Sequence, residues 1–292
     1  MKQLVILSGK GGTGKTTVAS SFIRLLDAKL YADCDVDAPN LHLLYKGNLD
    51  KETDFYGLPK ANIDSTKCIG CGRCKDYCKF GAITSNDGFK VTQLDCEGCG
   101  VCEIVCPSGA ISLSTAKAGD LRLYTNEDRV FSTAELKMGN GTSGKLVTEV
   151  KKQLRNNAKT DGIAIIDGSP GIGCPVIATL SGADAVLIVA EPSLSGISDM
   201  ERIVGTARGF GVKVFVCVNK YDINKENSAK IEKYCIDNSL TFVGKIPYDK
   251  EAVTLVNNGK TIVEGDTISG RAVRKIFDNV IGFLGEEWRY MY

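Results

Sequence analysis

The sequence predicts an α/β protein: a doubly wound, mostly parallel sheet with a small inserted α+β unit. Short apolar runs alternate with segments of helical periodicity along most of the 292 residues, a pattern typical of a parallel sheet covered on both faces. A glycine-rich loop joins the first apolar run to the first helical segment. Eight of the twelve cysteines lie between Cys68 and Cys106, which predicts the insertion.

The glycine-rich loop follows an expected strand at residues 4–8 and precedes an expected helix at 16–27. It fits G-x-x-x-x-G-K-[ST], with Gly9, Gly14, Lys15 and Thr16 in the fixed positions. Glycines let the backbone N–H groups wrap around phosphate oxygens, and the helix N-terminus favours the same anion. The predicted nucleotide-binding residues are Gly9, Lys10, Gly11, Gly12, Thr13, Gly14, Lys15, Thr16 and Thr17. We expect Lys15 to reach the β/γ-phosphates and Thr16 to ligate Mg²⁺. A glycine-rich turn with a chance lysine would not explain the flanking strand and helix.

A second expected strand, at residues 29–32, leads into an acidic loop over 33–41. Asp33, Asp35 and Asp37 lie just beyond the strand end, near the phosphate loop. Carboxylates in this place suit Mg²⁺ binding and the positioning of a water molecule. A solvated acidic turn is the alternative.

The cysteine-rich segment contains the same spacing twice, in residues 68–78 and 96–106. Each run reads C-x₂-C-x₂-C-x₃-C, the bacterial ferredoxin pattern in which the fourth cysteine ligates the other cluster. Each run is followed by Gly-Ala-Ile, so the two form an internal repeat. The predicted ligands are Cys68, Cys71, Cys74 and Cys106 for one [4Fe–4S] cluster, and Cys96, Cys99, Cys102 and Cys78 for the other. Two zinc sites could also be built from eight cysteines, but zinc explains neither the third cysteine of each run nor the repeat.

Beyond the insertion the α/β pattern resumes. The buried strand expected at 163–167 ends in Asp167, the Walker B pattern, and Asp167 is expected to contact the Mg²⁺ shell through water. The remaining expected elements are strands at 121–124, 130–131, 185–190, 212–218 and 242–246, and helices at 145–156, 198–210, 224–238 and 271–292. The last helix has an apolar face that suits packing on the sheet; Asp278, Glu286 and Glu287 argue against the alternative, a membrane-targeting helix.

Composition restricts the class of protein. The net charge is +1, so no strong field favours nucleic acid or an anionic membrane. The start of the chain has no signal-peptide pattern and no apolar run has the length of a membrane span, so we expect a soluble, cytoplasmic protein. The single histidine, His42, argues against histidine acid–base catalysis and mixed Cys/His zinc sites.

The run Gly-Lys-Gly-Gly-x-Gly-Lys-Thr-Thr resembles the deviant P-loop of the MinD/ParA/Mrp and nitrogenase-iron-protein superfamily, of the SIMIBI type. The resemblance implies that Lys10 crosses a dimer interface to the partner's nucleotide, and hence a homodimer on ATP binding. A solvated loop lysine is the alternative. By the same resemblance Asp33 helps the Mg²⁺ shell and Asp35 orients the attacking water, whereas the offset of Asp37 is shared by only part of the superfamily. Lys10, Lys15 and Asp35 are therefore the implied catalytic residues.

The resemblance also implies the nucleotide-base site and a second switch. Asn219, at a strand end, matches the adenine-contacting asparagine, and Pro247 and Asp249 match the loop that closes over the base. Residues 168–173 match switch II, which responds to the γ-phosphate.

Cys174 lies seven residues beyond Asp167. In the nitrogenase iron protein, a cysteine at this offset binds a cluster that bridges two subunits, whereas a small buried side chain is an equally good interpretation. Cys34, between two switch aspartates, has the same two interpretations. Cys217 and Cys235 are expected in the core.

The whole chain resembles MinD-superfamily ATPases with an inserted two-cluster ferredoxin domain, similar to those that accompany the orange protein of anaerobes. The implied division is 1–62 and 114–292 for the ATPase domain and 63–113 for the insertion. The implied cofactors are ATP, Mg²⁺ and two [4Fe–4S] clusters, with slow, partner-stimulated ATP hydrolysis. The nucleotide state would be coupled to electron transfer or metal-cluster assembly with a redox or metal-cluster protein as partner; the alternative is a cluster carrier or scaffold with structural ferredoxin clusters. A partitioning ATPase fits neither the insertion nor the neutral charge.

Overall fold

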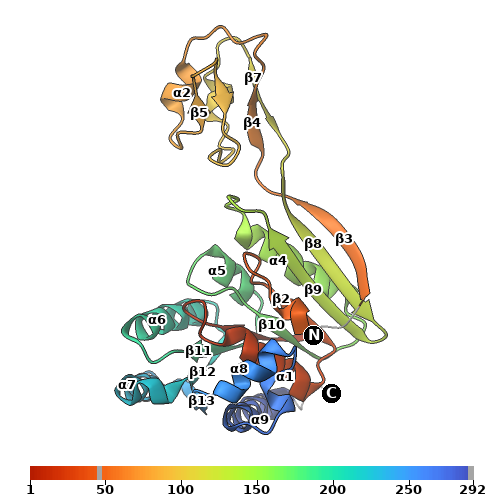
Figure 1. Cartoon of the computed structure of the whole chain (residues 1–292), viewed down its shortest axis with the longest axis vertical. Helices are drawn as coiled ribbons and strands as arrows, with labels where there is room; N and C mark the ends of the chain where they lie inside the picture. Colours follow the sequence, from red (N-terminus) through yellow and green to blue (C-terminus); the bar gives the residue numbers. More distant parts are fainter. Residues whose placement is uncertain (45–47, 289–292) are drawn as a thin grey trace.

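A nine-stranded sheet forms the centre of the computed structural model, which describes residues 1–44 and 48–288 (Figure 1). The strand order is β13-β12-β11-β1-β10-β2-β9-β8-β3. The strands from β13 to β9 are mutually parallel, and β8 and β3 add an antiparallel edge. The bounds are β1 (Lys2–Leu7), β2 (Leu30–Asp33), β3 (Asn48–Tyr56), β8 (Lys117–Asn126), β9 (Arg129–Leu136), β10 (Ile163–Asp167), β11 (Ala185–Ala190), β12 (Lys213–Asn219) and β13 (Thr241–Ile246). The predicted mostly parallel α/β sheet is confirmed.

Helices cover both faces of the sheet because alternate side chains of each buried strand point to opposite sides. In β1, Val5 and Leu7 pack in one layer, and Leu4 and Ile6 in the other. The first layer holds α4 (Ser143–Asn157), α5 (Cys174–Leu180), α6 (Leu194–Gly209) and α7 (Lys225–Asp237). The second holds α1 (Lys15–Leu26), α8 (Lys250–Asn257) and α9 (Ile268–Trp288).

The C-terminal helix packs on the sheet, as its apolar spacing predicts. Val273, Ile276, Val280 and Leu284 are all buried in the second layer. The side chains of Glu286 and Glu287, and residues 289–292 of the expected helix, lie outside the described part of the chain. Among the described helices, none combines the length and apolarity needed to cross a membrane.

Several elements differ from the sequence-based expectation. The strand β3 was not predicted because its sequence, NLDKETDFY, is polar, and only Phe55 in it is buried. Ion pairs across the edge compensate: Lys117 Nζ lies 2.6 Å from Asp54, and Arg122 Nε lies 2.8 Å from Glu52. The short helices α5 and α8 were also not predicted, and α6 begins earlier than residue 198 because the Ser193 hydroxyl accepts the Gly196 N–H.

Residues 60–114 form a small unit that stands away from the main sheet at one end of β3 and β8 (Figure 1). It contains β4 (Lys60–Ile63), α2 (Arg73–Tyr77), β5 (Ile83–Thr84), β6 (Lys90–Val91), α3 (Val101–Ile104) and β7 (Ile111–Ser114). It has its own buried cluster, which includes Ala61, Ile83 and Ile111. The chain leaves the sheet by β3 and returns by its antiparallel neighbour β8, so the insertion leaves the parallel strands undisturbed.

Candidate functional site

The glycine-rich loop lies between β1 and α1, and its backbone requires glycine at two positions. Gly12 and Gly14 have φ of 78° and 92°, in the left-handed region. A Cβ at Gly14 would also overlap the side-chain nitrogen of Asn219. No side chain caps the N-terminus of α1, so its first N–H groups stay available to an anion.

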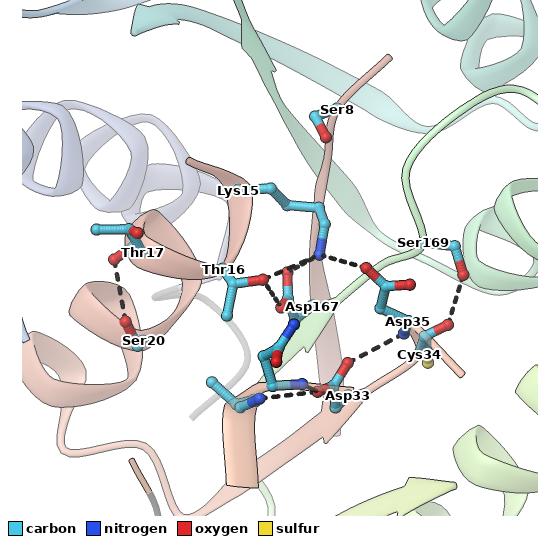
Figure 2. A network of polar contacts seen from close by, with 12 residues as sticks. Ser8, Lys15, Thr16, Thr17, Ser20, Asp33, Cys34, Asp35, Asp167 and Ser169 are labelled. Carbon is cyan, nitrogen blue, oxygen red and sulfur yellow. Dashed lines mark hydrogen bonds and ion pairs between the residues drawn. The ribbon is translucent and has the colours of Figure 1, made fainter. Parts of the chain in front are cut away.

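A buried ion pair joins this loop to the end of β10 (Figure 2). Lys15 Nζ lies 2.7 Å from Asp167 Oδ1, and the Thr16 hydroxyl donates to Asp167 Oδ2 at 2.6 Å. Asp35 Oδ2 lies 3.7 Å from the same ammonium group. The lysine and the threonine that the motif singles out therefore both contact the Walker B carboxylate.

Burial and neighbouring charges at this site shift the pKa of Asp33, Asp35 and Lys15. Burial, followed by the charge of Asp167, raises the pKa of Asp33 from 3.8 to about 7. Burial also raises the pKa of Asp35 to about 6. Burial alone would lower the pKa of Lys15, but Asp167, Asp35 and Asp33 outweigh it and hold that pKa above its ordinary value. With its three carboxyl groups ionised around one ammonium group, the site has a net negative charge that a divalent cation would neutralise.

We expect the nucleotide-free protein to lose stability as the pH rises from about 4 to about 7. The native state keeps protons on Asp33 and Asp35 in this window while the unfolded chain has released them, so raising the pH favours unfolding. The Asp35→Asn variant, which cannot release this proton, should show a shallower decline. Thermal unfolding midpoints of both proteins at a series of pH values measure this. The same slope in variant and wild type would contradict it.

An open cavity of about 590 Å³ lies over the loop and is also lined by residues of the acidic loop and of the segment that follows β10. Its walls are Ser8, Lys10, Gly11, Gly12, Thr13, Gly14, Lys15, Thr16, Thr17, Asp35, Asp37, Ala38, Asn40, Ser169, Pro170 and Pro175. Within the described residues, the buried Thr13 hydroxyl has no hydrogen-bond partner, which fits a polar ligand there. The oxygen donors of Thr16 and Asp35, beside Asp167, suit Mg²⁺. Asn40 and Ser169 are not among the predicted site residues, although they lie in the acidic loop and in the segment that matches switch II.

Asp33 is placed differently from Asp35. Its two oxygens accept backbone N–H groups of Asp35, Asn40 and Leu41 at 2.9–3.0 Å, and the residue is fully buried. It does not line the cavity and holds the acidic loop in shape, so its predicted part in the Mg²⁺ shell remains a prediction.

An adjoining cavity of about 240 Å³ is lined by the three residues expected at the base, Asn219, Pro247 and Asp249. The Asn219 amide donates to the Thr13 carbonyl oxygen at 2.6 Å. Asp249 caps α8 through the Glu251 N–H and accepts from Ser269 of α9. The other walls, which were not predicted, include Val253 and Val256 of α8; both are partly exposed apolar side chains that a flat ring could cover.

Lys10 reaches the loop that follows β11. Its Nζ lies 2.5 Å from Glu191 Oε2 and 3.2 Å from Ser193 Oγ. The side chain remains 38% exposed at the rim of the larger cavity. In the single chain it is therefore held on its own subunit by an ion pair that would have to open before Lys10 could reach a second chain.

The eight clustered cysteines lie around two small cavities in the inserted unit. One cavity is bordered by Cys68, Cys71, Cys74 and Cys106. The other is bordered by Cys78, Cys96, Cys99 and Cys102. Each cavity thus combines three cysteines of one run with the fourth of the other, the same grouping as the crossed prediction.

The donor set fits [4Fe–4S] clusters. Within the described residues, no three His, Cys, Asp or Glu side chains converge on a single metal ion. A [4Fe–4S] cluster does not need its cysteines to converge on one point, because each of the four thiolates binds a different iron atom of the cluster. Backbone N–H groups already point at two of the sulfurs, from Ala110 to Cys106 at 3.3 Å and from Ala61 to Cys96 at 3.5 Å.

The inserted unit also approaches the large domain at residues 139–141, which lie between β9 and α4. A Cβ on Gly139 would lie 3.1 Å from Leu94, and one on Gly141 would lie 3.4 Å from the Glu97 carboxylate. A Cβ on Gly144, in the same loop-to-helix segment, would lie 3.1 Å from Cys174. Cys174 is the first residue of α5 and directly follows residues 168–173, the segment expected to be switch II.

The four cysteines outside the two runs differ in their exposure to solvent. Cys174 is exposed, so the buried interpretation of this residue is wrong. Cys34, Cys217 and Cys235 are buried, and burial raises the pKa of Cys34 and of Cys217 to about 12. These three thiols are core residues.

The chain is similar to several known proteins. Residues 4–262 match the family described as CobQ/CobB/MinD/ParA nucleotide binding domain. An uncharacterized protein of Methanocaldococcus jannaschii is 31% identical, with 97% of each chain covered. An iron-sulfur cluster carrier protein of Pyrococcus abyssi is 25% identical over 97% of this chain and 87% of its own length. The structure of the septum site-determining protein MinD with Mg-ADP from Pyrococcus horikoshii has the same fold, with a TM-score of 0.58, 16% identity and 98% of both chains covered.

Proposed function

The chain belongs to the CobQ/CobB/MinD/ParA nucleotide-binding family, and from this premise we propose that it is a dimeric ATPase switch that couples its nucleotide state to two [4Fe–4S] clusters. The coupling would serve electron transfer or metal-cluster assembly. One observation carries the proposal: two four-cysteine cavities lie in a unit that approaches the large domain at residues 139–141.

In this proposal each nucleotide-site residue has a separate task. The loop N–H groups and Lys15 hold the β- and γ-phosphates, and Thr16 with Asp167 holds Mg²⁺, which neutralises charge on the phosphates. Asp35, which lines the cavity, orients the attacking water. Lys10 leaves Glu191 and reaches the nucleotide of the second chain, where its charge stabilises the transferring phosphoryl group.

The switch would reach the cluster unit through contacts already present. In the nucleotide-bound state, Lys15 would turn from Asp167 toward the phosphates and Thr16 would share Mg²⁺ with Asp167, which would leave residues 168–173 free to move. Movement there displaces Cys174 and, through Gly144, residues 139–141, which touch Leu94 and Glu97. Buried Lys151 of α4 supports this transmission because its ammonium donates to carbonyl oxygens of Thr179 and Ser181 at the end of α5, so both helices move together.

We expect ATP to shift the reduction potential of the clusters. Anaerobic potentiometry of the purified protein with Mg·ATP, Mg·ADP and no nucleotide would measure this. A shift of roughly 30 mV or more in the cluster beside Glu97 is expected from moving a charge near it. Equal potentials in all three states would contradict coupling.

A cluster carrier is the second candidate. Exposed Cys174 and the similarity to proteins named iron-sulfur cluster carriers favour it. In this case the eight-cysteine unit is structural and a further, labile cluster is handed to an acceptor. Transfer to an apo-acceptor that stops in Cys174→Ser, with unchanged cluster potentials in every nucleotide state, would select this candidate.

A further inference from the structure

The two runs of the cysteine unit carry opposite charges at equivalent positions. Aligning residues 67–78 with 95–106 places Lys67 opposite Asp95 and Lys75 opposite Glu103. Between them, Arg73 corresponds to uncharged Val101. Residues 67–78 therefore carry three cations and one carboxylate, Asp76, whereas residues 95–106 carry three carboxylates and no cation.

The basic side chains of the first run are accessible. The Lys67 side chain is 64% exposed and has Asp64 at 3.7 Å, a weak surface pair. Arg73 and Lys75 are also exposed. Among them lie exposed Cys71 and Ile69, an apolar side chain that is 67% exposed.

The basic run also lies at the free end of the unit. Residues 57–59 and 115–116 connect the unit to the main sheet and are called the neck here. The ladder of β4 and β7 begins beside the neck, at Lys60 and Ser114, and ends at Ile63 and Ile111. Ile63 and Ile111 line the cavity of Cys68, whereas Ala61 and Leu113 line that of Cys96. Gly98, beside Cys96, packs on the Pro59 carbonyl group in the neck. The acidic half thus faces the large domain, and the basic half faces away from it (Figure 1).

We propose that this free end, formed by Lys67, Ile69, Arg73 and Lys75, is the docking surface for a small acidic electron-carrier protein. The inference rests on the proposed function of the cysteine unit. Positive charge attracts an acidic partner and orients it, and an exposed apolar side chain at the centre supplies contact area. The carboxylates near the neck repel the same partner, which leaves the free end as the point of contact. The carrier, in its reduced form, would lose one electron to an iron–sulfur cluster held by the cysteine unit, with no proton or bond exchanged.

The test exchanges the charges between the two runs. Lys67→Asp with Lys75→Glu gives the first run the residues of the second, and Asp95→Lys with Glu103→Lys is the matched control. Each anaerobically purified, iron-loaded protein is mixed with a reduced acidic ferredoxin in a stopped-flow spectrometer at low and high salt. At low salt, we expect the first variant to be reduced more slowly than wild type by a factor of roughly ten or more. At high salt, this difference should vanish. The control should react at least as fast as wild type, and dithionite should reduce all three equally.

Several results would overturn the inference. An unchanged rate in the first variant, or an equal loss in the control, would show that the free end is not the docking surface. Binding of anionic vesicles or nucleic acid to this end, without reaction with the ferredoxin, would also overturn it. Wild-type protein that holds no iron would overturn the proposed function first, and this inference with it. Iron content and visible absorbance equal to those of wild type exclude misfolding as the cause of a slower rate.

Discussion

Replacing Lys15 with alanine is expected to reduce ATP hydrolysis by at least ~10²-fold and to abolish nucleotide-dependent dimerisation. The ammonium group is buried against Asp167 and borders the cavity over the loop, so its loss removes the charge that would meet the phosphates. The inserted unit has its own core, so the variant should keep about eight iron atoms per chain. Phosphate release, size-exclusion chromatography with Mg·ATP and iron analysis measure the three quantities.

Two further variants make this result specific. Lys15→Ala leaves the Asp167 carboxylate buried without its partner, which destabilises a protein by about 3–5 kcal/mol. Lys15→Gln keeps a hydrogen-bond donor for Asp167 and should lose hydrolysis with a smaller change in stability. Lys152→Ala removes an exposed lysine of α4 and should behave as wild type. Loss of iron in Lys15→Gln would show that the two units do not fold independently.

Removing Cys106 is expected to eliminate the cluster of the first run, not that of its own run. Cys106 borders the cavity of Cys68, Cys71 and Cys74. A [4Fe–4S] cluster normally needs four thiolates, so Cys106→Ala should lose about four of about eight iron atoms. The electron paramagnetic resonance spectrum of the cluster that remains in Cys106→Ala should equal that of the cluster that remains in Cys68→Ala.

The reciprocal variant supplies the control. Cys78→Ala should lose the other cluster and match Cys96→Ala, because both residues border the second cavity. Cys235→Ala, in the core of the large domain, should keep all the iron. If Cys106→Ala retained the same spectrum as Cys96→Ala, each run would hold its own cluster and the crossed grouping would be wrong.

Short-range patterns made much of this protein predictable from its sequence. A phosphate loop binds phosphate with consecutive backbone N–H groups, so nine adjacent residues are enough to identify it. Central parallel strands such as β11 are buried on both faces, which forces an unbroken apolar run. The two cysteine runs likewise predicted crossed sets of cysteines, and the same sets border the two cavities of the small unit; that they ligate clusters stays a prediction.

The polar edge of the sheet was decided by tertiary contacts. The β3 strand buries one side chain, so no hydrophobic pattern marks it, and its partner β8 lies some 70 residues away, as in the pair Glu52–Arg122. The different positions of Asp33 and Asp35 also depend on how the acidic loop folds back on its own backbone.

The sequence by itself determined the family and the sheet class, and it predicted which residues bind phosphate and iron, because each of these rests on a local pattern. Only the tertiary structure decided that Lys10 pairs with Glu191, that residues 139–141 touch the cysteine unit, and that its basic half faces away from the large domain. These features join residues far apart in the chain. Their distances follow from the packing of whole elements, which no local pattern contains.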